Sequence, residues 1–174
     1  MTIDLTLLDP TFMGKCQALL NGCASQNVIM VPTYGLRTLE AQAKLWRQSR
    51  STAVVTAEIQ SLRAIQCDYL ADILQGVGPQ PTAKWATDAI PGLSWHNWGQ
   101  ALDCMWQLDD GSFEEDGDTP GYHTYGQQAK SLGLRWGGDF SHEDYGHVQL
   151  NQKELTSLYP LKYINDHFKD KDVS

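Results

Sequence analysis

The stretch SWHNWGQALDCMW, Ser94 to Trp106, places a histidine and a carboxylate seven positions apart. A straight strand would separate His96 from Asp103 by roughly 23 Å, at about 3.3 Å per residue. A straight helix would place both on one face but about 10 Å apart. Two ligands of one metal ion each lie about 2 Å from it. The two side chains can therefore share an ion only if the chain turns back between them.

The residues between His96 and Asp103 can supply this turn. Asn97 and Gly99 tolerate unusual backbone φ angles, and the residues that follow alternate as a strand does. Successive side chains of a strand point to opposite faces, so Asp103 shares its face with the small Ala101, which leaves space above an ion. The two expected faces are Ala101, Asp103 and Met105, and Leu102, Cys104 and Trp106.

Taken alone, His96 and Asp103 also have an ordinary interpretation. Asp103 could be a buried carboxylate paired with an arginine, and His96 a hydrogen-bonded loop histidine. A downstream segment, HEDYGHVQL, favours the metal site because it places His147 on an expected strand as a third ligand.

A carboxylate in the same segment suits a hydrolytic site. Asp144 lies three positions before His147 and could act as the general base without ligating the ion. His142 and Glu143 compete for the roles of ligand and base, and a solvated polar turn is the alternative for both.

Composition indicates a globular chain. The 174 residues suit one domain with one core, and 41% are hydrophobic and 20% charged. The net charge of −8 argues against nucleic-acid or anionic-membrane partners. No apolar run approaches the roughly 18 residues of a membrane span. The four cysteines lack CxxC spacing and are expected to be reduced and buried.

The hydrophobic pattern predicts an α+β fold: one domain over residues 1–174, with a small antiparallel sheet flanked by helices. Helix starts are expected at Asp9-Pro10, Thr38, Thr56 and Thr119-Pro120, and Asn151 with Glu154 resembles a capping box. The helix from Thr56 is expected to end at Gly76. The expected strands lie in NVIMVPTYG, GQALDCMWQL and YGHVQL, and Pro160 divides the last helical segments.

The two segments that hold the candidate ligands together resemble a known family. S-x-H-x-x-G-x-A-x-D runs from Ser94 to Asp103, and [DE]-x-x-H runs from Asp144 to His147. The combination is similar to the zinc peptidases that cleave peptidoglycan stem peptides, a group that includes D-Ala-D-Ala peptidases and phage L-alanyl-D-glutamate endopeptidases. YGLRTLEAQAKLW and LGLRWGGDF resemble two further segments of this family. The implied fold is that of the Hedgehog proteins and D,D-peptidases.

The resemblance implies a role for each matching residue. The ligands of one zinc ion would be His96, Asp103 and His147, and Asp144 would be the catalytic acid and base. Arg37 would stabilise the oxyanion; its alternative is a surface salt bridge, which the positive helix start disfavours. The residues expected to contact substrate are Ser94, Trp95 and Trp98. For the tryptophans, core packing is the alternative.

The predicted function is hydrolysis of the L-Ala–D-Glu bond of peptidoglycan by a phage lysis enzyme. The start MTIDLTLLDP does not resemble a signal peptide. Synthesis in the host cytoplasm, release through a pore-forming partner and action on the wall as a monomer are therefore expected. No separate wall-binding domain is expected. The alternatives are a D,D-carboxypeptidase or D-Ala-D-Ala dipeptidase, and a non-catalytic, zinc-bearing wall-binding module.

An acidic stretch, Asp109 to Asp118, lies outside the family pattern. Its carboxylates could bind calcium, but it lacks the D-x-D-x-D-G ligand spacing. A solvated acidic loop is the favoured interpretation, and zinc is the only expected cofactor.

Overall fold

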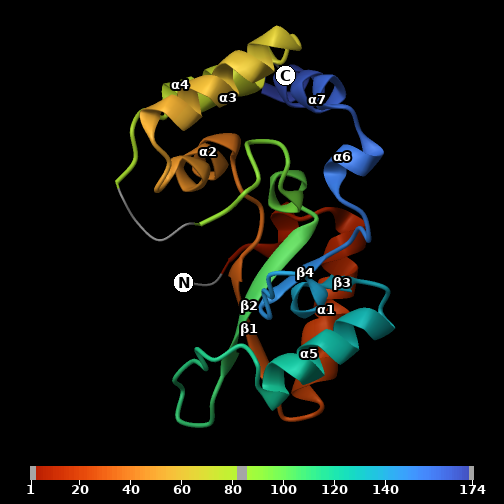
Figure 1. Cartoon of the computed structure of the whole chain (residues 1–174). Helices are drawn as coiled ribbons and strands as arrows, with labels where there is room; N and C mark the ends of the chain where they lie inside the picture. Colours follow the sequence, from red (N-terminus) through yellow and green to blue (C-terminus); the bar gives the residue numbers. More distant parts are fainter. Residues whose placement is uncertain (1–2, 82–85, 173–174) are drawn as a thin grey trace. The chain divides into compact units, whose positions relative to one another are not determined.

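A computed structural model of the chain describes residues 3–81 and 86–172 (Figure 1). The described residues form two compact units. Unit 1 consists of residues 1–36 and 98–152, and unit 2 of residues 37–97 and 153–174. The expectation of one catalytic domain over residues 1–174, without a wall-binding domain, stays a prediction.

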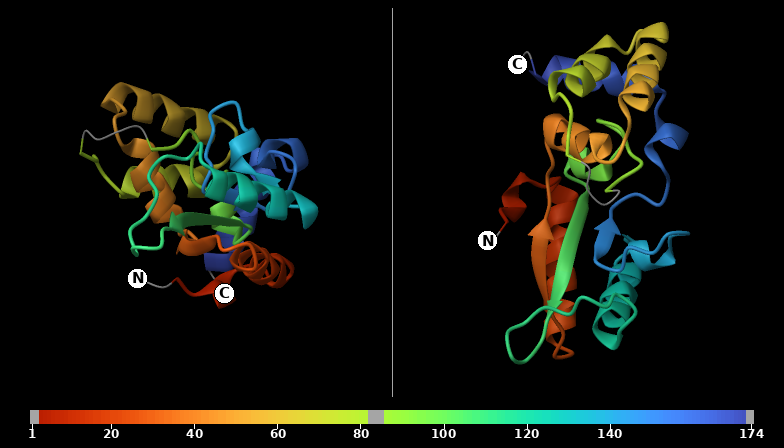
Figure 2. Two further views of the ribbon diagram at one scale, coloured as in Figure 1. Left: turned by 90° about the horizontal axis from the view of Figure 1, so that it is seen from below. Right: turned by 60° about the vertical axis from the view of Figure 1, so that its left-hand side comes forward.

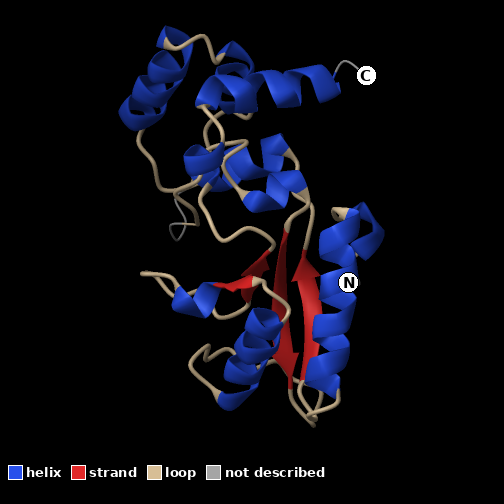
Figure 3. Cartoon of the chain, turned by 90° about the vertical axis from the view of Figure 1, so that its right-hand side faces the viewer, coloured by secondary structure: helices blue, strands red, loops and turns tan. Residues whose placement is uncertain are grey.

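Unit 1 contains the sheet. Within the described residues, four strands form one antiparallel sheet in the order β1-β2-β4-β3, drawn red in Figure 3. The strands are β1 (Ile29–Tyr34), β2 (Ala101–Gln107), β3 (Arg135–Trp136) and β4 (His147–Gln149). The α+β class and the small antiparallel sheet predicted from the sequence are confirmed.

Two helices pack with this sheet, α1 (Pro10–Ala24) and α5 (Pro120–Ser131). Figure 2 shows α1 running alongside β1 and β2 in its right-hand view. Asp9 begins α1 as predicted, because its Oδ1 accepts hydrogen bonds from Thr11 N and Phe12 N, at 2.9 and 3.1 Å. Two short 3-10 turns complete the unit, η1 (Leu5–Leu7) and η3 (Gly137–Asp139).

The two faces of the sheet differ in chemistry. Leu102 and Cys104 of β2 and Val148 of β4 join the core made with α1 and α5. The alternate positions, Asp103 and His147, point to the other face, as strand geometry requires. The sheet therefore separates an apolar core from a polar face.

Three cysteines lie in the core of unit 1 and one in unit 2, all buried and free of disulfides. Burial raises the pKa of the Cys16 thiol to about 12 and that of Cys23 to about 11. The thiols are therefore protonated and unreactive at neutral pH.

Unit 2 is helical. Its described elements are α2 (Leu39–Arg47), α3 (Thr52–Ala64), α4 (Asp68–Gly76), the 3-10 turn η2 (Trp95–Trp98), α6 (Leu155–Leu158) and α7 (Leu161–Asp172). The last residue of η2, Trp98, already belongs to unit 1. Thr38 caps α2 as predicted, accepting from Ala41 N at 3.1 Å. None of the helices among the described residues has the length and hydrophobicity that crossing a bilayer requires.

The predicted single helix from Thr56 to Gly76 is wrong. Ser51 caps α3 instead, since its Oγ accepts from Val54 N at 3.3 Å, and Thr56 lies inside the helix. The helix then ends because Gln66 takes a left-handed conformation, φ 60°, and Cys67 N donates to Leu62 O at 2.9 Å. The helix α4 starts anew at Asp68.

The predicted capping box of Asn151 and Glu154 is also wrong. Glu154 itself precedes the first residue of α6, and no side chain caps that helix. The Asn151 amide instead donates to Gln100 Oε1 at 2.7 Å. Asn151 therefore supports unit 1 rather than a helix start.

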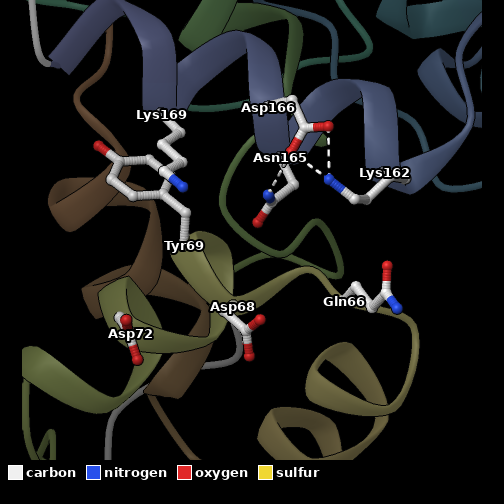
Figure 4. A pocket seen from close by; sticks show the side chains of 8 residues that line it. All are labelled: Gln66, Asp68, Tyr69, Asp72, Lys162, Asn165, Asp166 and Lys169. Carbon is white, nitrogen blue, oxygen red and sulfur yellow. Dashed lines mark hydrogen bonds and ion pairs between the residues drawn. The ribbon is translucent and has the colours of Figure 1, made fainter.

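A hollow of about 530 Å³ lies between α4 and α7 in unit 2 (Figure 4). Most of its charged groups are already paired. Asp68 and Asp72 form ion pairs with Arg63, and Lys162 pairs with Asp166. This pairing gives the hollow a structural explanation without a ligand.

We expect Gly99→Ala to lower the free energy of unfolding by about 1–3 kcal/mol. Gly99 has φ +67°, and an added Cβ would lie 3.2 Å from Asp9 N and 3.3 Å from Leu7 O. Urea denaturation measures the change. The control is Gly14→Ala within α1, where nothing lies within 4 Å and we expect a gain of about 0.4–1 kcal/mol. Equal effects of the two substitutions would contradict this account of the turn.

Candidate metal centre

Asp103 and His147 face each other across the ladder of β2 and β4. His147 Nδ1 lies 2.9 Å from Asp103 Oδ1, and the histidine is 9% exposed. Directly opposite residues of an antiparallel pair have Cβ atoms about 4.5–5.5 Å apart, so the pairing register itself brings the two side chains together. The sheet thus supplies two of the three predicted ligands.

His96 precedes β2 along the chain, on the turn η2. Gly99, with φ +67°, redirects the backbone between η2 and β2, and its carbonyl accepts from Asp9 N at 2.9 Å. This is the turn expected from the spacing of His96 and Asp103. The ligand atoms of His96, Asp103 and His147 all lie within 4.8 Å of one another.

These residues fit a divalent metal ion of the zinc type. Two imidazole nitrogens and one carboxylate oxygen make a ligand set typical of catalytic zinc, with a fourth position left for water or substrate. Ligands of a tetrahedral ion at about 2 Å lie roughly 3.4 Å apart. The three candidate ligand atoms lie within 4.8 Å of one another, so small side-chain movements would bring them to this spacing. In the part of the chain that the structure describes, this is the one such cluster of His, Cys, Asp and Glu found.

Opposing influences act on the pKa of His147. Burial lowers it, but the hydrogen bond and negative charge of Asp103, followed by the charge of Asp144 and the contact with Gln149, outweigh burial and raise the pKa. Metal binding requires a deprotonated nitrogen and therefore competes with this proton.

Asp144 lies beside the sheet residues of the site. With Asp103, it lines a hollow of about 390 Å³. Its backbone is held on both sides, because Asp144 N donates to Gly137 O and Asp144 O accepts from His147 N, each at 3.0 Å. The backbone at Asp144 is thus tied to the ligand strand β4. His142, Glu143 and Asp144 are all exposed, but only Asp144 and Glu143 line this hollow, so Glu143 stays a competitor for the role of base and His142 lies outside the lining.

Gly137, the first glycine of the LRWGG segment, lies against the backbone of Asp144. A Cβ at this position would lie 2.3 Å from Asp144 O, so only glycine allows the backbone approach that holds Asp144. This role of Gly137 was not predicted from the sequence, although the paired glycines Gly137 and Gly138 were a signal for it.

Arg37 is bonded through its backbone to the segment that carries His96. Arg37 N donates to His96 O at 3.0 Å, and the Asn97 amide donates to Arg37 O at 2.9 Å. The guanidinium donates to Gln42 Oε1, also at 2.9 Å. Buried Asn97 and Gln42 therefore orient Arg37, and neither was predicted to act in this way.

The residues predicted to contact substrate differ in placement. Ser94 Oγ accepts from His96 N at 3.4 Å, which orders the ligand turn. Trp95 is 5% exposed and its indole donates to Lys153 O at 3.2 Å, a placement that favours packing. Trp98 is half-buried. Substrate contact by Ser94, Trp95 and Trp98 stays a prediction.

The acidic loop shows no ligand cluster. Asp110, Glu114 and Asp116 accept hydrogen bonds from backbone N–H groups of the loop itself, at 2.9–3.1 Å. These three carboxylates thus form turn hydrogen bonds within the loop, and such bonds need no metal ion. Calcium binding by this loop stays untested.

Several known proteins are similar to this chain, and one family model matches the segment that holds the candidate site. Residues 87–150, which span all three metal-ligand candidates and Asp144, match the family model of D-alanyl-D-alanine carboxypeptidases. The chain is also 27% identical over 151 residues to the peptidoglycan L-alanyl-D-glutamate endopeptidase CwlK of Bacillus subtilis (strain 168). The similarity covers 82% of this chain and 73% of that protein.

Two solved structures resemble the chain more distantly. The L-Ala D-Glu endopeptidase ChiX of Serratia marcescens is 16% identical, with a TM-score of 0.43, over 84% of this chain and 83% of that one. The vancomycin resistance D,D-pentapeptidase VanY, an E175A mutant with Zn(II), is 17% identical, with a TM-score of 0.47, over 90% and 83% of the respective chains.

We expect His96→Ala to abolish stabilisation by zinc. A ligand at 100 times its Kd raises the free energy of unfolding by about 2.7 kcal/mol, and removing one of three ligands removes this gain. Thermal unfolding with and without zinc measures it. The control is His142→Ala, an exposed histidine outside the cluster, which should keep the full gain. Equal zinc stabilisation of both variants would place the ion elsewhere.

Proposed function

We propose that this chain, a metallopeptidase of the D-alanyl-D-alanine carboxypeptidase family, hydrolyses peptidoglycan stem peptides with one zinc ion. The ligands would be His96, Asp103 and His147. The observation that carries the proposal is the meeting of these three ligand atoms within 4.8 Å, with Asp103 lining the same hollow as Asp144.

Bound zinc would supply Lewis-acid chemistry, polarising a scissile carbonyl and making water acidic enough to attack it. Asp144 would accept the proton of the attacking water and return it to the leaving amine. The two backbone hydrogen bonds of Asp144 hold its position relative to the ligand strand. A backbone held in this way would limit the rearrangement that the side chain needs before proton transfer.

Arg37 would stabilise the negative charge that develops on the carbonyl oxygen. A fixed cation contributes most when the charge appears only in the transition state. The contacts of Arg37 with Gln42, Asn97 and His96 restrict its movement, as this role requires. Ser94 would order the ligand turn through His96 N.

The bond that we propose is L-Ala–D-Glu. Its support is the similarity to the Bacillus subtilis protein named an L-alanyl-D-glutamate endopeptidase, together with the LGLRWGGDF segment. The alternative is a D,D-peptidase activity, which the family model's name supports. A non-catalytic wall-binding module is a third candidate, and Asp144 beside the ligand strand disfavours it.

A role in phage lysis would suit such an activity. The enzyme would be made in the host cytoplasm, pass through a pore formed by a partner protein and act on the wall as a monomer. This part of the proposal rests on the resemblance of the motifs to phage endopeptidases.

We expect Asp144→Ala to reduce hydrolysis by at least about 100-fold while zinc stays bound, because the general base is lost but no ligand is. Turbidity of purified peptidoglycan and zinc content measure the two properties. Glu143→Ala, the neighbouring carboxylate in the same hollow, is the matched control and should keep activity. Loss of activity in Glu143→Ala alone would assign the base to Glu143.

The bond can be identified from digestion products by mass spectrometry. New N-terminal D-Glu is expected from cleavage of L-Ala–D-Glu. Released D-Ala instead would establish the D,D-peptidase alternative. Zinc binding without any digestion of several purified peptidoglycans would favour the wall-binding module.

A further inference from the structure

Gln149 is a buried amide at the centre of the sheet. It ends β4, where it lies opposite Ala101 of β2 and Arg135 of β3, and it is 4% exposed. Burying an amide costs free energy unless hydrogen bonds replace those to water. The polar partners of Gln149 therefore matter more than its packing.

The amide orientation follows from one of these partners. Gln149 Nε2 lies 2.7 Å from Asn151 O, a carbonyl oxygen that only accepts hydrogen bonds. The nitrogen of the amide must therefore face Asn151, and the oxygen must face the other way. Gln149 Oε1 then lies 3.2 Å from His147 Nε2.

The same reasoning places a proton on His147. An amide oxygen only accepts, so His147 Nε2 must donate and carry hydrogen. In the metal-free protein Nδ1 donates its own proton to Asp103, and a metal ion would take the place of that proton while the proton on Nε2 stays. Nδ1 is the atom that lies 2.9 Å from Asp103 Oδ1, on the side of the candidate ligands.

We propose that Gln149 is a positioning residue that holds His147 as the Nε2–H tautomer, with Nδ1 directed at the metal. The inference rests on the proposed metal centre. Metal-ligating histidines commonly donate their second ring N–H to an acceptor that fixes ring and tautomer. Here the acceptor comes from the same strand, two residues beyond the ligand.

A chain of amides anchors this arrangement. The Asn151 side chain donates to Gln100 Oε1 at 2.7 Å, and Gln100 Nε2 lies 3.4 Å from Asp9 Oδ2. Asp9 also caps α1. Gln149 is thus held by a segment that is fixed to a helix start, and its acceptor cannot turn away from His147 without breaking the bond to Asn151.

Two substitutions distinguish an effect on the orientation of His147 from an effect on the stability of the fold. Gln149→Leu removes both the acceptor toward His147 and the donor toward Asn151. Gln149→Glu keeps the acceptor but loses the donor, so its fold should be weakened while its zinc site is kept. Gln100→Leu is the control, since it removes an amide of the same chain without touching His147.

The measurement is the zinc Kd by chelator competition, which needs no substrate, with thermal unfolding of the metal-free proteins beside it. We expect Gln149→Leu to weaken zinc binding about 10–100-fold, and Gln149→Glu and Gln100→Leu to stay within about threefold of the parent. In the zinc-loaded parent and Gln149→Glu, the His147 Nε2–H should give a proton signal protected from solvent exchange, and Gln149→Leu should lose it.

The proposal is overturned if Gln149→Leu binds zinc as tightly as the parent. It is also overturned if Gln149→Glu loses zinc affinity to the same degree as it loses thermal stability. If Gln149→Leu does not fold, Gln149→Glu alone decides in the same way. A parent that binds no zinc overturns both this inference and the proposed function. A parent that binds zinc without hydrolysing peptidoglycan overturns the function alone.

Discussion

The pairing of Asp103 with His147 across β2 and β4 is the contact on which the site depends. A shift of one strand by one residue in this ladder would turn one of the two side chains toward the apolar core and separate the pair. The register is held from the core side, where Leu102, Cys104 and Val148 are buried between the sheet and its helices. Hydrophobic packing on one face of the sheet therefore determines the polar chemistry on the other.

Two glycines adapt the backbone around this pair. Gly99 takes a left-handed conformation where the chain turns toward β2, and Gly137 lets the backbone of Asp144 approach within the distance of a hydrogen bond. Both positions exclude a Cβ, one by conformation and the other by contact. The metal ligands and the base thus depend on residues that carry no functional group.

The helix start at Asp9-Pro10, the strand faces and the turn after His96 could be predicted because each depends on nearby residues. The break between α3 and α4 could not, since a left-handed Gln66 carries no distinctive signal. Asn151 was misread because its partner, Gln100, lies 51 positions away. Gln149 was missed for a related reason: its role appears only when the orientation of its amide is known.

The central claim is that His96, Asp103 and His147 hold one metal ion. Anomalous diffraction from crystals of the zinc-loaded protein, collected at the zinc absorption edge, tests it most directly. The account predicts one peak about 2.0–2.2 Å from a nitrogen of each histidine and an oxygen of Asp103. An empty centre with zinc on the acidic loop, or on a cysteine sulfur, would contradict it.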